Sequence, residues 1–169
     1  MSTLPAAETD CYYNSPLGLI YLASTLTGIS KLQFVDDVNS EIIMTEPSHP
    51  LLIRLVSELE NYFSGSLKKF TVPLDPNGTD FQKKVWEAVS AIPYGEVASY
   101  TKLSEILHQP QAIRAVANSN ARNPLLILVP CHRVIGSNGD LTGYAGGLTR
   151  KKLLLEREGA LNQLSLDLH

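Results

Sequence analysis

The chain has 169 residues, of which 44% are hydrophobic and 18% are charged, as in an ordinary globular protein with a sizeable core. This composition excludes a disordered chain, and no apolar run is long enough to span a bilayer. The net charge of −3 by itself argues weakly against a nucleic-acid partner.

The N-terminus and the two cysteines predict a cytoplasmic protein. Residues 1–5, MSTLP, lack the basic start and the apolar core of an export signal. Cys11 and Cys131 stand far apart, so we expect free thiols in a reducing compartment rather than a disulfide. The histidines are scattered and none has zinc-site spacing to a cysteine, so we expect neither a metal nor a cofactor.

The first half of the chain predicts a sheet followed by a helix. Residues 11–35 are rich in β-branched, aromatic and leucine side chains, and two turn signals interrupt them. This pattern predicts about three antiparallel strands. A helix is expected from near Pro50, capped by Ser48 and ended at Gly65, because leucines recur there at helical spacing.

A Pro/Gly/Asp-rich stretch at residues 73–78 is the best domain boundary, so we expect domains at 1–78 and 79–169. The charge changes at the same place. Residues 1–80 carry four Lys or Arg against ten Asp or Glu, whereas residues 81–169 carry ten against seven. A polyanion would therefore meet the second half, although two ordinary solvated surfaces explain the asymmetry equally well.

The second domain is expected to begin with helices. Thr79 and Gln82 form a capping box ahead of an amphipathic helix. Two short helices follow, at residues 100–107 and 111–120, with Pro110 at the start of the second. Their tight connection and the polar side chains of the second helix suggest a helix-turn-helix, although most helix pairs bind nothing.

The remaining residues surround a cysteine. The apolar run 125–129 predicts a buried strand that ends next to Cys131. A tight turn at 137–140 and a glycine-rich loop at 142–147 come next, and a final helix is expected to end at Glu158.

Cys131 is directly followed by His132, which makes it the candidate nucleophile, since a nearby base favours the reactive thiolate. Adjacent side chains on an extended strand point to opposite faces, so contact between the two would need a turn or a bridging water. A histidine base also needs an orienting acceptor, and Glu158 or Glu156 can supply it. Asn123 is expected to hold the strand end. The alternative is that Cys131 is only a small buried hydrophobic residue.

Five segments stand out in the second half: YGEVASY at 94–100, AIRAV at 112–116, NP at 123–124, PCHRV at 130–134 and GYAGGL at 143–148. Together they resemble the active-site region of the O6-alkylguanine-DNA alkyltransferases. The resemblance covers residues 79–160 closely and the first half only loosely. It implies an α/β (α+β) fold, with an RNase H-like N-terminal domain of antiparallel sheet plus helix. The C-terminal domain would be mostly helical, of winged-helix or helix-turn-helix type, and would carry the active-site cysteine.

The resemblance implies direct-reversal DNA repair, in which a methyl or other alkyl group moves irreversibly from guanine O6 to Cys131. Thymine O4 is a possible second lesion. His132 would act as a water-mediated base, oriented by Glu158, and Asn123 would stabilise the turn. Tyr100 would donate a proton or a hydrogen bond to the departing guanine.

The resemblance also implies a pocket for the base. The carbonyls of Val134 and Cys131 and the amide of Ala145 would read the base edges. Tyr144 and the loop at Gly146 would form the pocket wall. Several relatives have a serine at position 145, whereas alanine here offers only its backbone.

Double-stranded DNA is the implied partner. The damaged nucleotide would rotate out of the duplex, and Arg114 would fill the gap it leaves. The second helix would enter the minor groove through Ala115, Ser119 and Asn120. We expect a monomer. Two rivals are a Cys-His hydrolase that turns over and a DNA-binding module without chemistry.

Overall fold

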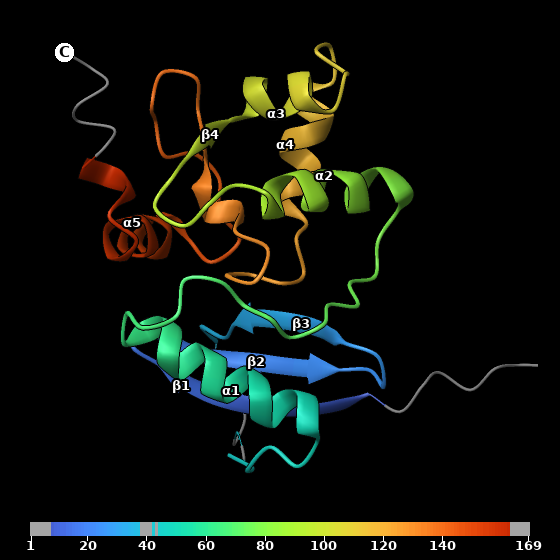
Figure 1. Ribbon diagram of the computed structural model, residues 1–169, viewed down its shortest axis with the longest axis vertical. Helices are drawn as coiled ribbons and strands as arrows, with labels where there is room; N and C mark the ends of the chain where they lie inside the picture. The colour runs from blue at the N-terminus through green and yellow to red at the C-terminus, as the bar shows by residue number, and fades with distance from the viewer. Residues whose placement is uncertain (1–7, 38–41, 43, 163–169) are drawn as a thin grey trace, which may run out of the picture. The chain divides into compact units, whose positions relative to one another are not determined.

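The computed structural model describes residues 8–37, 42 and 44–162, so the N-terminal stretch MSTLP and His169 lie outside the described residues. The chain divides into two compact units, Met1–Asn77 and Gly78–His169 (Figure 1). Among the described helices, none combines the length and the apolarity needed to cross a membrane. The mixed α/β class is confirmed, and each unit is described by itself below.

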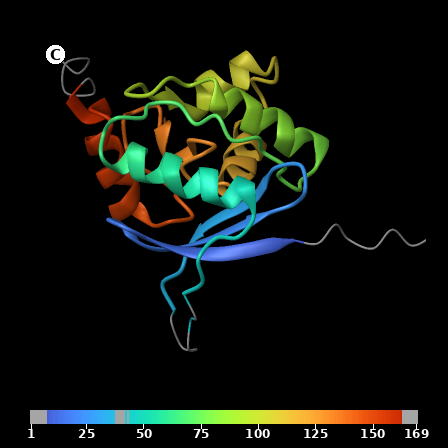
Figure 2. The ribbon, with the colours of Figure 1, turned by 60° about the horizontal axis from the view of Figure 1, so that its bottom comes forward.

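The N-terminal unit contains the predicted sheet. Strands β1 (Thr9–Ser15), β2 (Gly18–Ser24) and β3 (Ile29–Phe34) pair antiparallel in the order β1-β2-β3. Helix α1 (Pro50–Phe63) lies along one face of this sheet (Figures 1 and 2). The prediction of a meander followed by a helix is confirmed.

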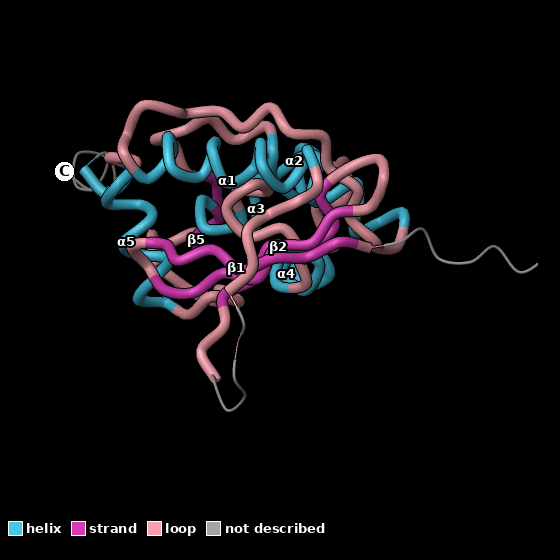
Figure 3. Tube along the Cα trace, turned by 90° about the horizontal axis from the view of Figure 1, so that it is seen from below, coloured by secondary structure: helices cyan, strands magenta, loops and turns pink. Residues whose placement is uncertain are grey.

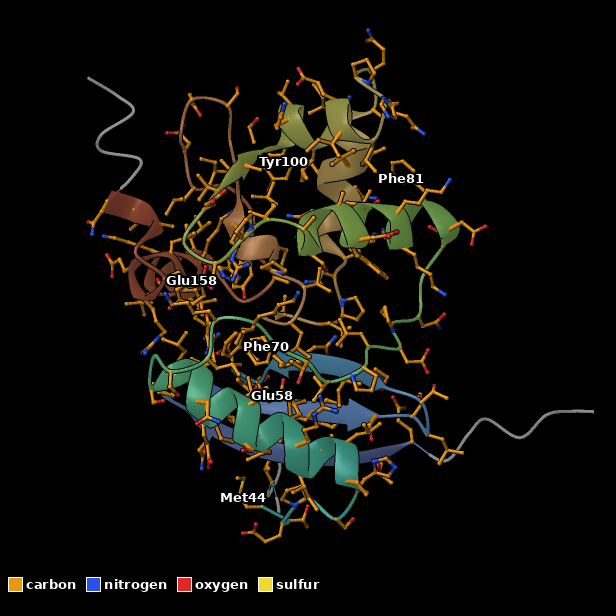
Figure 4. The ribbon with its side chains drawn as sticks, in the orientation of Figure 1. Met44, Glu58, Phe70, Phe81, Tyr100 and Glu158 are labelled. Atoms are coloured by element: carbon orange, nitrogen blue, oxygen red, sulfur yellow. The ribbon has the colours of Figure 1, made fainter. Side chains whose placement is uncertain are left out.

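The cap of α1 differs from the prediction. His49, not Ser48, is the N-cap, and its Nδ1 accepts a hydrogen bond from Leu51 N at 3.2 Å. The reason is that Pro50 occupies the first helical position, which makes the residue directly before it the cap. Farther along α1, the Glu58 carboxylate accepts from the amides of Thr71 and Val72, at 2.9 and 3.4 Å. Figure 4 shows Glu58 on α1.

The C-terminal unit is mostly helical. Helix α2 (Asp80–Ser90) begins with the predicted capping box, in which Thr79 and Gln82 bond reciprocally. Helix α3 (Tyr100–Ile106) and helix α4 (Ile113–Ala121) pack on each other, and both pack on α2. The predicted helix pair is confirmed; Figure 3 distinguishes its helices from the connecting loop by colour.

The second helix of the pair starts later than predicted. It begins at Ile113 rather than at residue 111, because Gln109–Ala112 form a turn in which Ala112 N donates to Gln109 O at 2.9 Å. Pro110 therefore lies in a tight turn before the helix.

The largest error concerns residues 125–129, which do not form a strand. Ile127 has φ 70°, and the amides of Leu128 and Val129 donate to Leu126 O and Leu125 O at 2.8 and 2.9 Å, so the chain coils on itself. All five side chains are nevertheless buried. The apolar run reported burial correctly, but burial alone does not distinguish a strand from a buried turn.

The chain after this coil positions the site. Cys131–Arg133 form a 3-10 turn, η1, and strand β5 (Val134–Ile135) then pairs parallel with β4 (Ala98–Ser99). The predicted tight turn follows, with Gly136 N donating to Asp140 O at 2.9 Å. Helix α5 (Leu148–Arg157) ends just before Glu158.

Candidate active site

Cys131 lies in the η1 turn and is only 2% exposed. The side-chain amide of Asn123 donates to Cys131 Sγ at 3.2 Å and to Val129 O at 2.8 Å. Its Oδ1 accepts from Leu125 N at 2.9 Å. Asn123 thus fastens both ends of the buried coil and contacts the sulfur itself.

His132 contacts Glu158, one of the two carboxylates considered from the sequence. The distance from His132 Nε2 to Glu158 Oε1 is 2.8 Å, and both side chains are fully buried. Glu156 instead faces outward and pairs with Lys152 at 3.8 Å. The structure therefore selects Glu158 as the histidine's partner.

Arg133 completes this cluster, a role that was not predicted from the sequence. Its guanidinium donates two hydrogen bonds to the Glu158 carboxylate, from Nε to Oε2 at 2.8 Å and from Nη2 to Oε1 at 3.0 Å. Nη1 donates to Ile92 O at 2.7 Å. An arginine directly after the Cys-His pair was the available signal, since a buried carboxylate needs a cation and fixed donors.

The electrostatics of the cluster fix its protonation. Burial alone would raise the pKa of Glu158, but hydrogen bonds from His132 and Arg133, together with their charges, lower it to about 2. Burial lowers the pKa of His132 despite the opposing effect of Glu158. At neutral pH, Glu158 is therefore ionised and His132 is neutral.

The histidine tautomer follows from these contacts. An ionised carboxylate only accepts, so His132 Nε2 carries the proton and Nδ1 is a free acceptor. Nδ1 is buried and has no hydrogen-bond partner among the residues that the structure describes. The unused acceptor belongs to the residue next to Cys131 in η1.

A buried lysine of α5 is also part of the site and was missed in the sequence. Lys151 is fully buried, and its Nζ donates to Val134 O at 2.5 Å, Thr142 O at 2.8 Å and Gly143 O at 3.3 Å. Burial lowers its pKa to about 8. Its spacing to Leu154, one helical turn on within the buried stripe of α5, was the available signal.

Burial also dominates the cysteine. It raises the pKa of Cys131 to about 11, while the Asn123 hydrogen bond and the Lys151 charge oppose this rise. In the protein at rest, Cys131 is therefore a thiol, and thiolate formation needs both a base and a compensating charge.

Two tyrosines stand at the site. Tyr100, at the start of α3 (Figure 4), donates to Thr142 O at 3.3 Å and shares a hydrogen bond with Asn120. The ring of Tyr144 meets His132 edge-on, with centroids 6.4 Å apart. The Tyr144 hydroxyl is buried without a partner in the described part of the chain.

The residues predicted to bind DNA fall into two groups. Arg114 and Ala115 lie exposed on α4, whereas Ser119 and Asn120 are each 3% exposed. Ser119 O accepts from Trp86 Nε1 at 2.8 Å, so this part of α4 faces α2. In the glycine-rich loop, Ala145 is exposed and Gly146 is buried.

Two family models match nearly the whole chain. Residues 80–160 match the DNA-binding domain of 6-O-methylguanine DNA methyltransferase, and residues 11–76 match its ribonuclease-like domain. The chain belongs to the 6-O-methylguanine DNA methyltransferase family. The family resemblance noted in the sequence is therefore confirmed, and it extends to the N-terminal half.

Relatives of this family are similar over most of their length. The methylated-DNA–protein-cysteine methyltransferase of Mycobacterium leprae is 45% identical over 146 residues, 86% of this chain and 88% of the relative. That of Methanosarcina acetivorans is 45% identical over 150 residues, 88% and 96% of the two chains.

Solved structures agree with the fold. The Mycobacterium tuberculosis O6-methylguanine methyltransferase superposes with a TM-score of 0.81 at 39% identity, covering 91% of this chain and 94% of that one. The structure of the M. tuberculosis protein OGT in complex with DNA gives a TM-score of 0.79 at 42% identity, covering 88% and 91%.

Proposed function

We propose that this protein repairs DNA by direct reversal, as a methylated-DNA–protein-cysteine methyltransferase that moves an alkyl group from guanine O6 irreversibly onto Cys131. The observation that carries the proposal is the buried Cys131 thiol, bonded to Asn123 and adjacent to the His132–Glu158 pair. The relatives' shared name supports the same chemistry.

His132 is the base of this reaction. Its Nδ1 is the available acceptor, and a water between Nδ1 and Cys131 Sγ would carry the thiol proton to the ring. Glu158 holds the ring in the required tautomer and stabilises the imidazolium that forms.

The transfer is a single displacement. The S–C bond forms as the C–O6 bond breaks, and the electron pair returns to guanine, which gains one proton while the thiol loses one. Tyr100 donates a proton or a hydrogen bond to the base as negative charge develops on it. The resulting thioether is a stable product, so each molecule reacts once.

The base would lie against the loop 142–147. The carbonyls of Val134 and Cys131 and the amide of Ala145 are proposed to read its edges. Tyr144 and Gly146 would form the wall, in keeping with the placement of the Tyr144 ring beside His132.

DNA binding is proposed to use α4 in the minor groove. The base reaches the buried thiol only after rotating out of the duplex, which costs about a few kcal/mol of unstacking. The exposed Arg114 would fill the gap, and Ala115 would allow close approach. Contacts of Ser119 and Asn120 with DNA stay predictions; their burial suits support of the helix and of Tyr100.

The assignment of DNA binding and alkyl transfer to residues 79–169, apart from the N-terminal domain at 1–78, also stays a prediction. So do the monomeric state, the cytoplasmic location and reaction at thymine O4.

The test is the intact mass of the protein after incubation with a duplex carrying one O6-methylguanine. The proposal predicts a gain of one methyl group per chain, saturating at one equivalent, and no gain with the unmethylated duplex. Unchanged protein mass with continuing substrate turnover would instead indicate a hydrolase.

A further inference from the structure

Lys151 is a buried cation without an acidic partner. Its three hydrogen bonds all go to backbone carbonyls, and no carboxylate of the described residues lies within ion-pair distance of its Nζ. A buried ammonium is costly unless a nearby negative charge compensates it. A negative charge that forms close to such an ammonium is therefore stabilised by it.

The other buried cation of the site is already neutralised. Arg133 forms an ion pair with Glu158, through two hydrogen bonds of 2.8 and 3.0 Å. The remaining ionisable groups that face Cys131 are Tyr100 of α3, Tyr144 of the loop and the neighbouring His132. None of these is positive at neutral pH, so Lys151 is the uncompensated positive charge that acts on the sulfur.

We propose that Lys151 is the counter-charge of the Cys131 thiolate: its ammonium, held in place by three carbonyls, stabilises the sulfur anion as the thiol proton leaves. The inference rests on the proposed function in taking Cys131 as the nucleophile. Lys151 is a positioning residue in this scheme, since it acts through Cys131.

The carbonyl contacts explain why the charge is effective. They join β5, through Val134, to the loop at Thr142 and Gly143, so the ammonium cannot turn toward solvent. A fixed charge in a dry site interacts much more strongly than one in water, and it needs no rearrangement when the anion forms.

The test measures the thiolate directly and contains no DNA. In a Cys11→Ser background, Cys131 is alkylated with iodoacetamide across a range of pH, and the modified peptide is quantified by mass spectrometry. The S–C bond forms as iodide leaves, so the rate follows the thiolate fraction. Lys151→Met keeps an unbranched side chain, one atom shorter than lysine, and removes its charge. Lys152→Met removes an equal charge from the exposed side chain next to it.

Lys151→Met should lower the alkylation rate by about tenfold or more below about pH 8, where Lys151 carries its charge, because a nearby opposite charge shifts a pKa by about 1–3 units. The rates should converge at high pH, and Lys152→Met should match the parent. A purely structural role predicts a loss of equal size at every pH; that result, or no loss at neutral pH, would overturn the proposal.

If the Lys151→Met protein does not fold, a reciprocal measurement on Lys151 itself tests the proposal. In the Cys131→Ser protein, the Lys151 ¹³Cε signal should titrate at lower pH than in the parent, because the interaction with the Cys131 charge, which raises the pKa of Lys151, is missing. Equal titration would overturn the proposal. Methyl transfer by the parent tests the proposed function separately, so the failure of one can be told from the failure of the other.

Discussion

Cys11 and Cys131 are almost equally buried, at 1% and 2% exposed. The charges around them nevertheless have opposite effects on the pKa of the thiol. Burial raises the pKa of both thiols. At Cys11, in the sheet, the negative charges of Asp10 and Glu46 raise the pKa further. At Cys131, the Asn123 hydrogen bond and the Lys151 charge act in the opposite direction. The comparison shows that burial by itself makes a cysteine inert, and that fixed donors and cations make a buried thiol usable.

The largest expected effect separates the two cysteines. Cys131→Ser should abolish the gain of a methyl group, because a serine hydroxyl in this site stays protonated and is a poor nucleophile. Cys11→Ser should retain full stoichiometry. Intact-mass measurement of both variants checks this, and methyl gain by Cys131→Ser would refute the assignment.

Acid should destabilise the protein through the buried Glu158. Its pKa of about 2 lies below that of an unfolded glutamate, so its contribution is present above about pH 4.5 and is lost as pH falls toward 2. The lowered pKa of buried His132 acts in the same sense below pH 6.5, because the unfolded chain then binds the extra proton. The Glu158 contribution is about 3 kcal/mol.

Urea unfolding at several pH values measures this effect. Glu158→Gln should flatten the acid limb of the stability curve, whereas the exposed Glu156→Gln should leave it unchanged. A parent protein equally stable at pH 3 and pH 7 would contradict the buried ionised cluster.

The same carboxylate should matter for rate. Glu158→Gln should slow methyl transfer at neutral pH by about a hundredfold, the lower range for loss of general-base catalysis, because the amide no longer stabilises the imidazolium. Single-turnover kinetics of the folded variant measure this, with Glu156→Gln as the control. A rate within twofold of the parent would show that His132 does not depend on Glu158.

A smaller and more selective loss is expected for Arg114→Ala. Repair of duplex DNA should fall by about tenfold or more, since the unstacked gap is no longer filled. Reaction with the free O6-methylguanine base should be nearly unchanged. Arg122→Ala, exposed at the end of the same helix, is the control. Equal losses on both substrates would argue against gap filling.

The smallest effect is expected for Tyr144→Phe. Its hydroxyl is buried without a partner in the described residues, so removing it should change the free energy of unfolding by less than about 1 kcal/mol, or stabilise the protein. Denaturant unfolding checks this. A loss above about 2 kcal/mol would mean that the hydroxyl is hydrogen-bonded in solution.

The sequence predicted those parts of the fold that depend on local rules. The Thr79–Gln82 capping box is a contact within one turn of the chain, and it is found as predicted. The strand predicted at residues 125–129 was wrong because an apolar run indicates burial but not backbone conformation. The positive φ of Ile127 depends on the packing around it. Glu158 could be singled out only as a candidate, since its choice over Glu156 depends on how α5 is rotated.

Arg133 and Lys151 show the remaining limit. Both are charged residues that are buried, and the sequence offers only weak signals for this: the position of Arg133 after the Cys-His pair and the helical spacing of Lys151 to Leu154. Their roles follow from contacts with residues 25 and 17 positions away in sequence, which only the folded chain brings together.

The most direct test of the account locates the methyl group. The protein is incubated with a duplex containing one O6-methylguanine and digested, and the peptides carrying Cys11 and Cys131 are compared by mass spectrometry. The account predicts one methyl group on the Cys131 peptide and none on the Cys11 peptide. A methyl group on Cys11, or on neither peptide while the lesion disappears from the DNA, would contradict it.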